Sequence, residues 1–247
     1  MSAVAETAAE VVTIAAARAR LAAVDWAEVA AALDSPGVAV CPGLLRPQEC
    51  AALAALYDEE SRFRSRVVMT RHGFGRGEYK YFDYPLPSTV ASLRTALYPH
   101  LAPVANRWNK MTSRPVHYPA EHARFIERCR HAGQTRPTPL LLKYEAGDCN
   151  CLHQDLYGEH VFPLQATLLL SAPGQDFTGG ELVLVEQRPR RQSRAEVVPL
   201  AQGDVAIFAV HQRPAKGLRG WVNMRHGVSR VRRGRRHTLG IIFHEAQ

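Results

Sequence analysis

Short apolar segments separated by turn residues fill the second half of the chain, and this pattern restricts the fold more than any other feature. Gly, Pro and Asp residues mark the breaks between segments of strand-like length and composition. The expected strands are 139–144, 149–153, 162–170, 181–185 and 205–208. Such a succession of short strands predicts a core made mostly of β-structure.

The first half of the chain favours helices instead. Helices are expected at 3–33, 46–60, 87–111 and 120–131, with one strand at 38–45. Helices followed by strands predict an α+β fold with a mostly β core. The specific expectation is a double-stranded β-helix, or jelly roll, buttressed by N-terminal helices.

One domain is expected to span residues 1–247. A chain of 247 residues that is 46% hydrophobic can bury a single core, and no repeat or low-complexity linker divides it. We expect residues 1–135 to supply mainly helical support and a substrate lid, and residues 136–247 to form the jelly-roll catalytic core.

The segment His153-Gln154-Asp155 lies late on one of the expected strands and provides two candidate metal ligands. Side chains at positions i and i+2 of a strand share a face, so His153 and Asp155 can bind one ion. His226 would complete a set of two imidazoles and one carboxylate. Non-heme Fe(II) oxygenases use this facial arrangement, which leaves coordination positions open for a chelating co-substrate and dioxygen.

Two alternatives remain for the metal ligands. His211 also follows His153 at a plausible distance, although it lacks a downstream Gly and Arg. Cys149, Cys151 and His153 alternate along one expected strand and are compatible with zinc, but no second pair of Cys or His at zinc-like spacing follows. Buried thiols are the simpler interpretation of these two cysteines.

The last two strands are expected to form a hairpin, with 223–231 and 235–243 joined by Arg232-Arg233-Gly234. In that register one face carries five side chains: His226, Val228, Arg230, Arg236 and Thr238. A guanidinium would then share a cavity with a metal ligand. Its planar fork can make two charge-assisted hydrogen bonds to a carboxylate, which favours a dicarboxylate co-substrate; a surface charge in a basic turn is the alternative.

Several segments within residues 139–244 resemble the signature of the 2-oxoglutarate- and Fe(II)-dependent dioxygenases. They are Leu152-His153-Gln154-Asp155, Phe177-x-Gly179-Gly180-Glu181-Leu182, Gly203-Asp204-x-x-x-Phe208 and His226-Gly227-Val228-x-x-Val231-x-x-Gly234-x-Arg236-x-x-Leu239. The Gly-Gly-Glu-Leu and Gly-x-Arg elements are similar to the prolyl-hydroxylase branch. Tyr144-x-x-Gly147 resembles the AlkB branch, which removes alkyl groups from nucleic-acid bases. The whole set, with the aromatic segment 73–82, resembles a bacterial oxygenase family described as acting on alkylation-damaged DNA.

This resemblance implies Fe(II), 2-oxoglutarate and O2 as cofactors and assigns a role to individual residues. His153, Asp155 and His226 would ligate the iron and form the catalytic centre. Arg236 would pair with the distal carboxylate of 2-oxoglutarate. If Arg236 does not bind this carboxylate, Arg230 or another cation would take the role.

Tyr144 would add a hydroxyl contact to the same co-substrate, although without the family it would be assigned to core packing. Two departures from the AlkB pattern bear on the substrate. Leu142 stands where that pattern has Asn, and Arg236 supplies only the first Arg of the AlkB-type ending. The substrate is therefore less determined by the resemblance than the chemistry.

Charge and aromatic residues bear on the substrate. The net charge is +8, and residues 188–236 hold thirteen Lys and Arg residues against Glu196 and Asp204. This asymmetry is typical of a phosphate-contacting surface and also of a solvated Arg-rich loop. Residues 71–84 mix rings, cations and Gly, as in enzymes that hold an extruded base, although each ring is equally compatible with core packing. The candidate lid residues are Phe74, Arg76, Tyr79, Tyr81 and Tyr157.

The function expected from these features is oxidative dealkylation of N-alkylated bases in DNA, and hence DNA repair with alkylated DNA as the partner. The alternatives are a prolyl-type protein hydroxylase, a small-molecule hydroxylase of the same superfamily, or a non-enzymatic jelly-roll module that binds metal. No obligate protein partner is evident.

A cytoplasmic location is expected. Five Cys residues at irregular spacing argue against a disulfide framework and fit a reducing compartment. Residues 1–10 are acidic and Ala-rich and do not resemble a secretory signal. No apolar stretch approaches the length of a membrane span, so no membrane association is expected.

Overall fold

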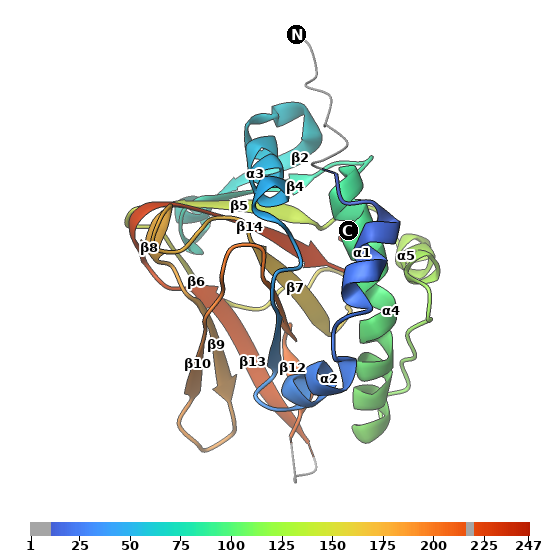
Figure 1. The fold of residues 1–247 in the computed structure, drawn as a ribbon. Helices are drawn as coiled ribbons and strands as arrows, with labels where there is room; N and C mark the ends of the chain where they lie inside the picture. Colours follow the sequence, from blue (N-terminus) through green and yellow to red (C-terminus); the bar gives the residue numbers. More distant parts are fainter. Residues whose placement is uncertain (1–10, 216–219) are drawn as a thin grey trace.

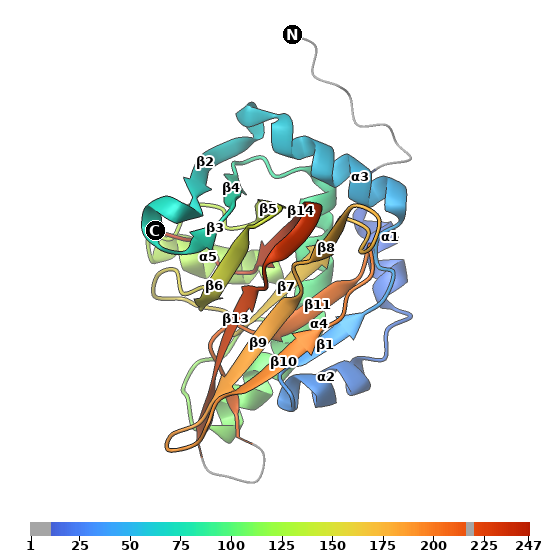
Figure 2. The same ribbon diagram turned by 90° about the vertical axis from the view of Figure 1, so that its left-hand side faces the viewer.

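The computed structural model describes residues 11–215 and 220–247 and contains two antiparallel sheets. The larger sheet has the order β1 (Val38–Cys41), β11 (Val205–Ala209), β7 (Leu164–Leu169), β14 (Val231–Ile242), β5 (Leu140–Glu145), β4 (Glu78–Phe82) and β2 (Phe63–Val68), with β8 (Phe177–Gly179) paired to β14. The smaller sheet has the order β10 (Arg194–Val198), β9 (Leu182–Gln187), β13 (Trp221–Val228), β6 (Cys149–His153) and β3 (Gly75–Arg76), with β12 (Gln212–Pro214) paired to β13. Figure 2 shows the smaller sheet in front of the larger one.

Helices cover the side of the larger sheet that faces away from the smaller one (Figure 1). They are α1 (Ile14–Leu21), α2 (Trp26–Asp34), α3 (Pro47–Ala55), α4 (Ser88–Met111) and α5 (His122–His131). The longest, α4, buries Leu93, Leu97 and Leu101 in the same apolar core as the inner strands β7 and β11. This packing confirms the jelly roll buttressed by helices. None of the helices in the described part of the chain has the length and apolar character needed to span a bilayer.

Local sequence signals explain where several helices begin and end. The segment expected as one helix at 3–33 contains two described helices, because the Asp25 carboxylate accepts hydrogen bonds from the amides of Ala27 and Glu28 and starts α2 there. Residues 3–10 of that expected helix lie outside the described residues. Pro47 opens α3, which ends at Ala55 rather than at 60 and continues as two short 3-10 turns.

The first half of the chain contributes more to the sheets than expected. The strands β2, β3 and β4 all come from residues 63–82, which include most of the segment expected to form a lid. The strand-like alternation of apolar and polar residues is interrupted in this short segment by Gly75 and Gly77. Both have positive φ, and the chain changes direction there between η3 (Met69–His72), β3 and β4. The helical assignment of residues 1–135 is therefore incomplete.

The expected hairpin of 223–231 with 235–243 is wrong. β13 and β14 lie in different sheets, and the chain passes from one to the other at Ser229 and Arg230. Gly is required at position 234, but the reason is not a hairpin turn. Its φ is +79°, and a Cβ there would lie 1.9 Å from the carbonyl oxygen of Asp176, because β14 runs against the segment that precedes β8.

A buried ion pair joins α4 to the C-terminal end of β14. Arg94 donates to Glu245 Oε1 at 2.8 Å and to the carbonyl oxygens of Ile242 and His244 at 2.9 and 3.0 Å. The side chains of Arg94 and Glu245 are 3% and 0% exposed. Since the pair is removed from water, loss of one partner leaves an uncompensated charge in the core.

Replacement of Arg94 by Met should lower the free energy of unfolding by about 3–5 kcal/mol, the usual cost of breaking a buried pair. Arg124→Met is the matched control, because Arg124 forms a 3.7 Å pair with Glu121 on the exposed face of α5. This control should change stability by no more than about 0.5 kcal/mol. Chemical denaturation of both variants measures the difference, and equal midpoints would contradict the structural role of Arg94.

Candidate functional site

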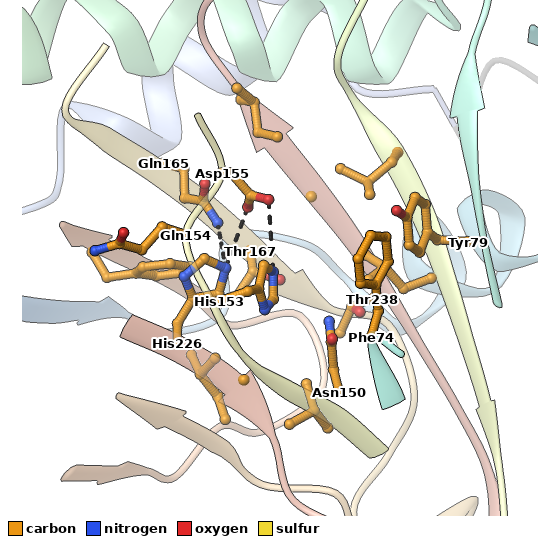
Figure 3. Close-up of a pocket in the computed structure, with 18 of the residues that line it drawn as sticks. Phe74, Tyr79, Asn150, His153, Gln154, Asp155, Gln165, Thr167, His226 and Thr238 are labelled. Atoms are coloured by element: carbon orange, nitrogen blue, oxygen red, sulfur yellow. Dashed lines mark hydrogen bonds and ion pairs between the residues drawn. The ribbon is translucent and has the colours of Figure 1, made fainter. Parts of the chain in front are cut away.

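A cavity of about 260 Å³ lies between the two sheets. Its walls come from β4, β5, β7 and β14 of the larger sheet and from β6 and β13 of the smaller one. Apolar side chains such as Leu140, Leu142 and Ile242 form much of its surface, and a few polar groups point into it (Figure 3). A largely apolar cavity with a few convergent polar groups is the usual form of a ligand site.

Three potential metal ligands meet in this cavity. His153 ends β6, Asp155 follows two residues later, and His226 lies on β13 directly opposite His153. All their ligand atoms lie within 4.8 Å of one another. Asp155 Oδ1 is 3.6 Å from His153 Nε2, and Asp155 Oδ2 is 3.3 Å from His226 Nε2 (Figure 3). This geometry suits one metal ion held by two imidazoles and a carboxylate.

A bulge in β6 turns His153 toward the cavity. Val228 pairs with Asn150 while His226 pairs with His153, so β6 contains one more residue than β13 between these two pairs. Asn150 and His153 therefore both line the cavity, whereas Cys151 is exposed and does not. The expected alternation of Cys149, Cys151 and His153 on one face is wrong for this reason. The cluster of metal-binding groups in the described residues contains no Cys.

The charge state of the cluster suits metal binding. Burial lowers the pKa of His153, and the neighbouring His226 lowers it further, so the imidazole is neutral and its lone pair is available. Burial alone would raise the pKa of Asp155. The hydrogen bond with His226, together with the Tyr157 hydroxyl bond, instead holds that pKa well below its usual range. A neutral imidazole beside an ionised carboxylate is a donor set for iron.

At the other end of the cavity lies Arg236, a buried cation. The residue is 2% exposed, and no Asp or Glu of the described residues forms an ion pair with it. Its Nη1 lies 3.4 Å from Thr238 Oγ1, and its Nε has no hydrogen-bond partner. Burial lowers the pKa of Arg236 to about 10, so it stays charged at neutral pH. An unneutralised buried guanidinium fits a carboxylate ligand.

Tyr144 lies beside Arg236 and pairs with it across β5 and β14. Its ring centroid is 5.5 Å from the guanidinium carbon, and the residue is fully buried. The Asn150 amide is 3.4 Å from the Tyr144 hydroxyl. The sequence prediction that Tyr144 and Arg236 face one ligand is thus compatible with their positions, although the role itself stays a prediction.

Four of the five residues expected to form a lid line the cavity: Phe74, Tyr79, Tyr81 and Tyr157. The fifth, Arg76, does not. Its side chain is 65% exposed and lies 3.6 Å from Asp148, because β3 pairs with β6 and adjacent side chains alternate between the faces. Arg76 therefore contacts the turn before β6 and not the cavity.

Arg230 and His211 also lie outside the cavity lining. Arg230 is exposed, since it belongs to the connection between β13 and β14 and not to a strand that continues the alternation of His226 and Val228. Of the five residues predicted to share that face, Arg230 is therefore misplaced. His211 precedes β12, and its carbonyl accepts the Met224 amide at 2.8 Å.

The basic residues of 188–236 do not form one surface. Arg188 and Arg194 flank the turn between β9 and β10 of the smaller sheet, whereas Arg232 and Arg233 lie on β14 of the larger sheet (Figure 2). Arg213 is fully buried and bonded to Glu186, and Arg236 lies in the cavity. Lys216 and Arg219 lie outside the described residues. The thirteen Lys and Arg residues of 188–236 therefore do not all belong to one phosphate-contacting surface, since at least Arg213 and Arg236 are buried.

Two glutamines at the cluster were not predicted. Gln165 on β7 is buried, and its Nε2 lies 3.1 Å from His226 Nε2 while its Oε1 has no partner. A lone Gln within the apolar run 162–170 was the available signal. Gln154 turns away from its two neighbours and donates to the carbonyl of Met224 at 2.8 Å, which fastens the loop to β13. Nothing in the sequence around Gln154 indicated this contact with β13.

A protein-family model described as "Oxygenase, catalysing oxidative methylation of damaged DNA" matches residues 77–246. Two curated relatives are the uncharacterized proteins MT2286 and Rv2227 of Mycobacterium tuberculosis. Each is 47% identical over 167 residues, which cover 67% of this chain and 72% of the relative.

Solved structures with a similar fold include two prolyl hydroxylases. A prolyl-4-hydroxylase of Pseudomonas putida has a TM-score of 0.52 and 16% identity and covers 87% of this chain and 96% of its own. A prolyl hydroxylase of Trichoplax adhaerens, in complex with a hypoxia inducible factor peptide, has a TM-score of 0.54 and 14% identity over 90% of this chain and 88% of its own. A 2OG-Fe(II) oxygenase family protein of Burkholderia pseudomallei has a TM-score of 0.50 and 17% identity over 91% and 94%. At these identities the likeness concerns the fold alone.

Asp155→Asn should weaken the binding of Fe(II) at least about 100-fold, because loss of a group that only hydrogen-bonds to a metal ligand already costs about 10–100-fold. The amide keeps the size of the carboxylate and removes its charge. Asp148→Asn is the control, since Asp148 lies in the turn before β6 and outside the cavity lining. Anaerobic calorimetric titration with Fe(II) measures both, and wild-type affinity in Asp155→Asn would reject the cluster as the metal site.

Proposed function

The chain belongs to the oxygenase family that its residues 77–246 match and is a 2-oxoglutarate- and Fe(II)-dependent oxygenase, and we propose that it removes alkyl groups from the bases of damaged DNA. The family is described by oxidative methylation of damaged DNA. An oxygenase supplies an oxygen atom and not a methyl group. The DNA reaction that suits this chemistry is oxidation of an alkyl group already on a base.

The observation that carries this proposal is the placement of a metal-ligand cluster and an unneutralised cation in one cavity. His153, Asp155 and His226 would hold the iron, and Arg236 with Tyr144 would hold the distal carboxylate of 2-oxoglutarate. When bound, iron lets dioxygen oxidise 2-oxoglutarate to succinate and carbon dioxide while one oxygen atom enters a C–H bond of the substrate. The two-ended polar arrangement orients the co-substrate along the cavity.

The rest of the cavity suits a flat aromatic group. Tyr79 and Tyr81 meet edge to face with ring centroids 5.4 Å apart, and the exposed Phe74 stacks on His72. Rings of this kind can stack on an extruded base, and stacking tolerates any base identity.

A cation lies next to this aromatic wall. The Arg64 guanidinium carbon is 4.5 Å from the Tyr81 ring centroid, and Arg64 also donates to the Pro137 carbonyl. In the described residues no carboxylate forms an ion pair with Arg64. A phosphate next to the extruded nucleotide would find a partly buried partner there.

The products follow from the proposed reaction. Insertion of oxygen into a C–H bond of an N-methyl group gives an N-hydroxymethyl group. Breakage of its C–N bond then releases formaldehyde and returns the proton to the base nitrogen. One formaldehyde is thus expected for each coupled succinate.

Methylated single- or double-stranded DNA should stimulate succinate formation by the wild-type protein with an equal amount of formaldehyde. Unmethylated DNA of the same sequence is the control, and methylated RNA and a prolyl peptide complete the panel. Asp155→Asn should form neither product. Succinate formation that responds to the peptide but not to methylated DNA would replace DNA dealkylation with prolyl-type hydroxylation.

Arg236→Lys should raise the KM for 2-oxoglutarate about tenfold to a hundredfold. The ammonium keeps the charge but loses the two-pronged hydrogen bond, and a charge-assisted hydrogen bond contributes about 1.5–3 kcal/mol. Arg230→Lys is the matched control, because Arg230 is exposed and outside the cavity. Steady-state succinate assays measure both variants. An unchanged KM in Arg236→Lys, or a raised one in Arg230→Lys, would contradict the assignment.

A further inference from the structure

The loop that follows β6 carries a tyrosine whose hydroxyl contacts the candidate metal-binding carboxylate. The Tyr157 hydroxyl donates to Asp155 Oδ1 at 2.8 Å. It also accepts a hydrogen bond from the Tyr81 hydroxyl at 2.9 Å. The Tyr157 hydroxyl is the donor to Asp155, because a carboxylate can only accept a hydrogen bond. The same hydroxyl oxygen is the acceptor of the Tyr81 hydrogen bond. The ring of Tyr157 lines the cavity, while its hydroxyl is hydrogen-bonded to Asp155.

The position of Tyr157 is set by a fully buried glutamine. Gln134 Nε2 donates to the carbonyl oxygens of Tyr157 and Glu245, at 2.9 and 2.5 Å. Its Oε1 accepts the amide of His160 at 2.7 Å. One side chain from the segment after α5 thus holds both ends of the loop 157–160. A buried amide with its partners satisfied makes a rigid anchor.

Gly158 shows how closely the loop is pressed against that anchor. Its φ is +84°, and a Cβ at this position would lie 2.5 Å from Gln134 Cδ. A side chain there would push the loop away from Gln134 and carry Tyr157 with it. At the other end, Gln154 fastens the loop to β13 through the Met224 carbonyl. The segment between the two anchors therefore has little freedom.

The two oxygens of Asp155 have different neighbours. Oδ2 lies 3.3 Å from His226 Nε2, whereas Oδ1 lies 3.6 Å from His153 Nε2 and receives the Tyr157 hydroxyl at 2.8 Å. A hydrogen bond to one oxygen fixes the rotation of the whole carboxylate, since its two oxygens turn together. It also occupies a lone pair that would otherwise be available for a second bond to a metal.

We propose that Tyr157 is a positioning residue that holds the Asp155 carboxylate in one orientation and reserves Oδ2 as its single metal-binding oxygen. This inference rests on the proposed function for the identity of the metal site. A carboxylate that binds through one oxygen keeps three coordination positions open, which a chelating co-substrate and dioxygen require. Tyr81 supports this role, because its hydroxyl donates to the Tyr157 oxygen and so keeps the Tyr157 hydroxyl hydrogen directed toward Asp155.

Removal of the hydroxyl tests this role through metal binding and not through turnover alone. Tyr157→Phe should weaken the binding of Fe(II) by about 10–100-fold, the usual effect of losing a hydrogen bond to a metal-binding side chain. It should also shift the visible absorption band that forms when Fe(II) and 2-oxoglutarate are added together without oxygen. Tyr81→Phe should move both quantities in the same direction by a smaller factor, because the Tyr157 bond to Asp155 remains.

Tyr118→Phe is the matched control. The Tyr118 hydroxyl is also buried and donates to the Val161 carbonyl at 2.7 Å, but it does not contact Asp155. It should lower the melting temperature without moving the Fe(II) affinity or the absorption band. If Tyr157→Phe does not fold, Tyr81→Phe decides the question by the same two readouts.

The outcomes separate this inference from the proposed function. Wild-type protein that binds no Fe(II) overturns the metal site and with it this role. If the wild-type protein binds Fe(II), and Tyr157→Phe binds it with the same affinity and shows the absorption band at the same position, only the positioning role is overturned. A shift of the same size in Tyr118→Phe also overturns it, because the effect would then be one of general stability.

Discussion

The antiparallel pairing of β13 with β6 is the interaction on which the candidate site depends. It places His226 opposite His153, although the two residues lie far apart in the chain. Backbone hydrogen bonds fix this register, and the bulge in β6 then directs His153 into the cavity. Asp155 reaches the same point because Gln154 ties its loop back to β13. One strand pairing thus brings all three candidate ligands together.

The cavity separates two unlike charges along its length. Asp155 lies next to His226, whose neighbour Gln165 pairs with Ile242 of β14, and Arg236 lies six residues away along the same strand. A buried cation without a counter-ion costs several kcal/mol, which a bound carboxylate offsets. Gly180 accommodates this cation, since a Cβ there would lie 3.0 Å from Arg236 Cδ and 2.9 Å from Val231 Cγ2. The Gly-Gly segment therefore supports the site by its lack of side chains.

Sequence patterns predicted the elements better than the way they pair. The apolar runs that became β5, β7 and β11 were placed correctly, because buried strands and their Gly or Pro breaks are encoded locally. The last two strands were expected to pair with each other and instead join different sheets. The aromatic segment was expected as a lid, but β4 is a member of the larger sheet. Pairing depends on partners distant in sequence, which local periodicity does not contain.

The sequence by itself determined the chemistry: two His and one Asp at the observed spacing, an Arg further along, and the family to which the chain belongs. Only the tertiary structure decided which other groups serve that chemistry. It buried Arg236 while leaving Arg230 exposed, and it brought Gln134 and Tyr81 to the loop that carries Asp155 and Tyr157. Ligand type and spacing are local properties of a chain. Burial and hydrogen-bond partners arise only when the two sheets and the helix-end segments pack together.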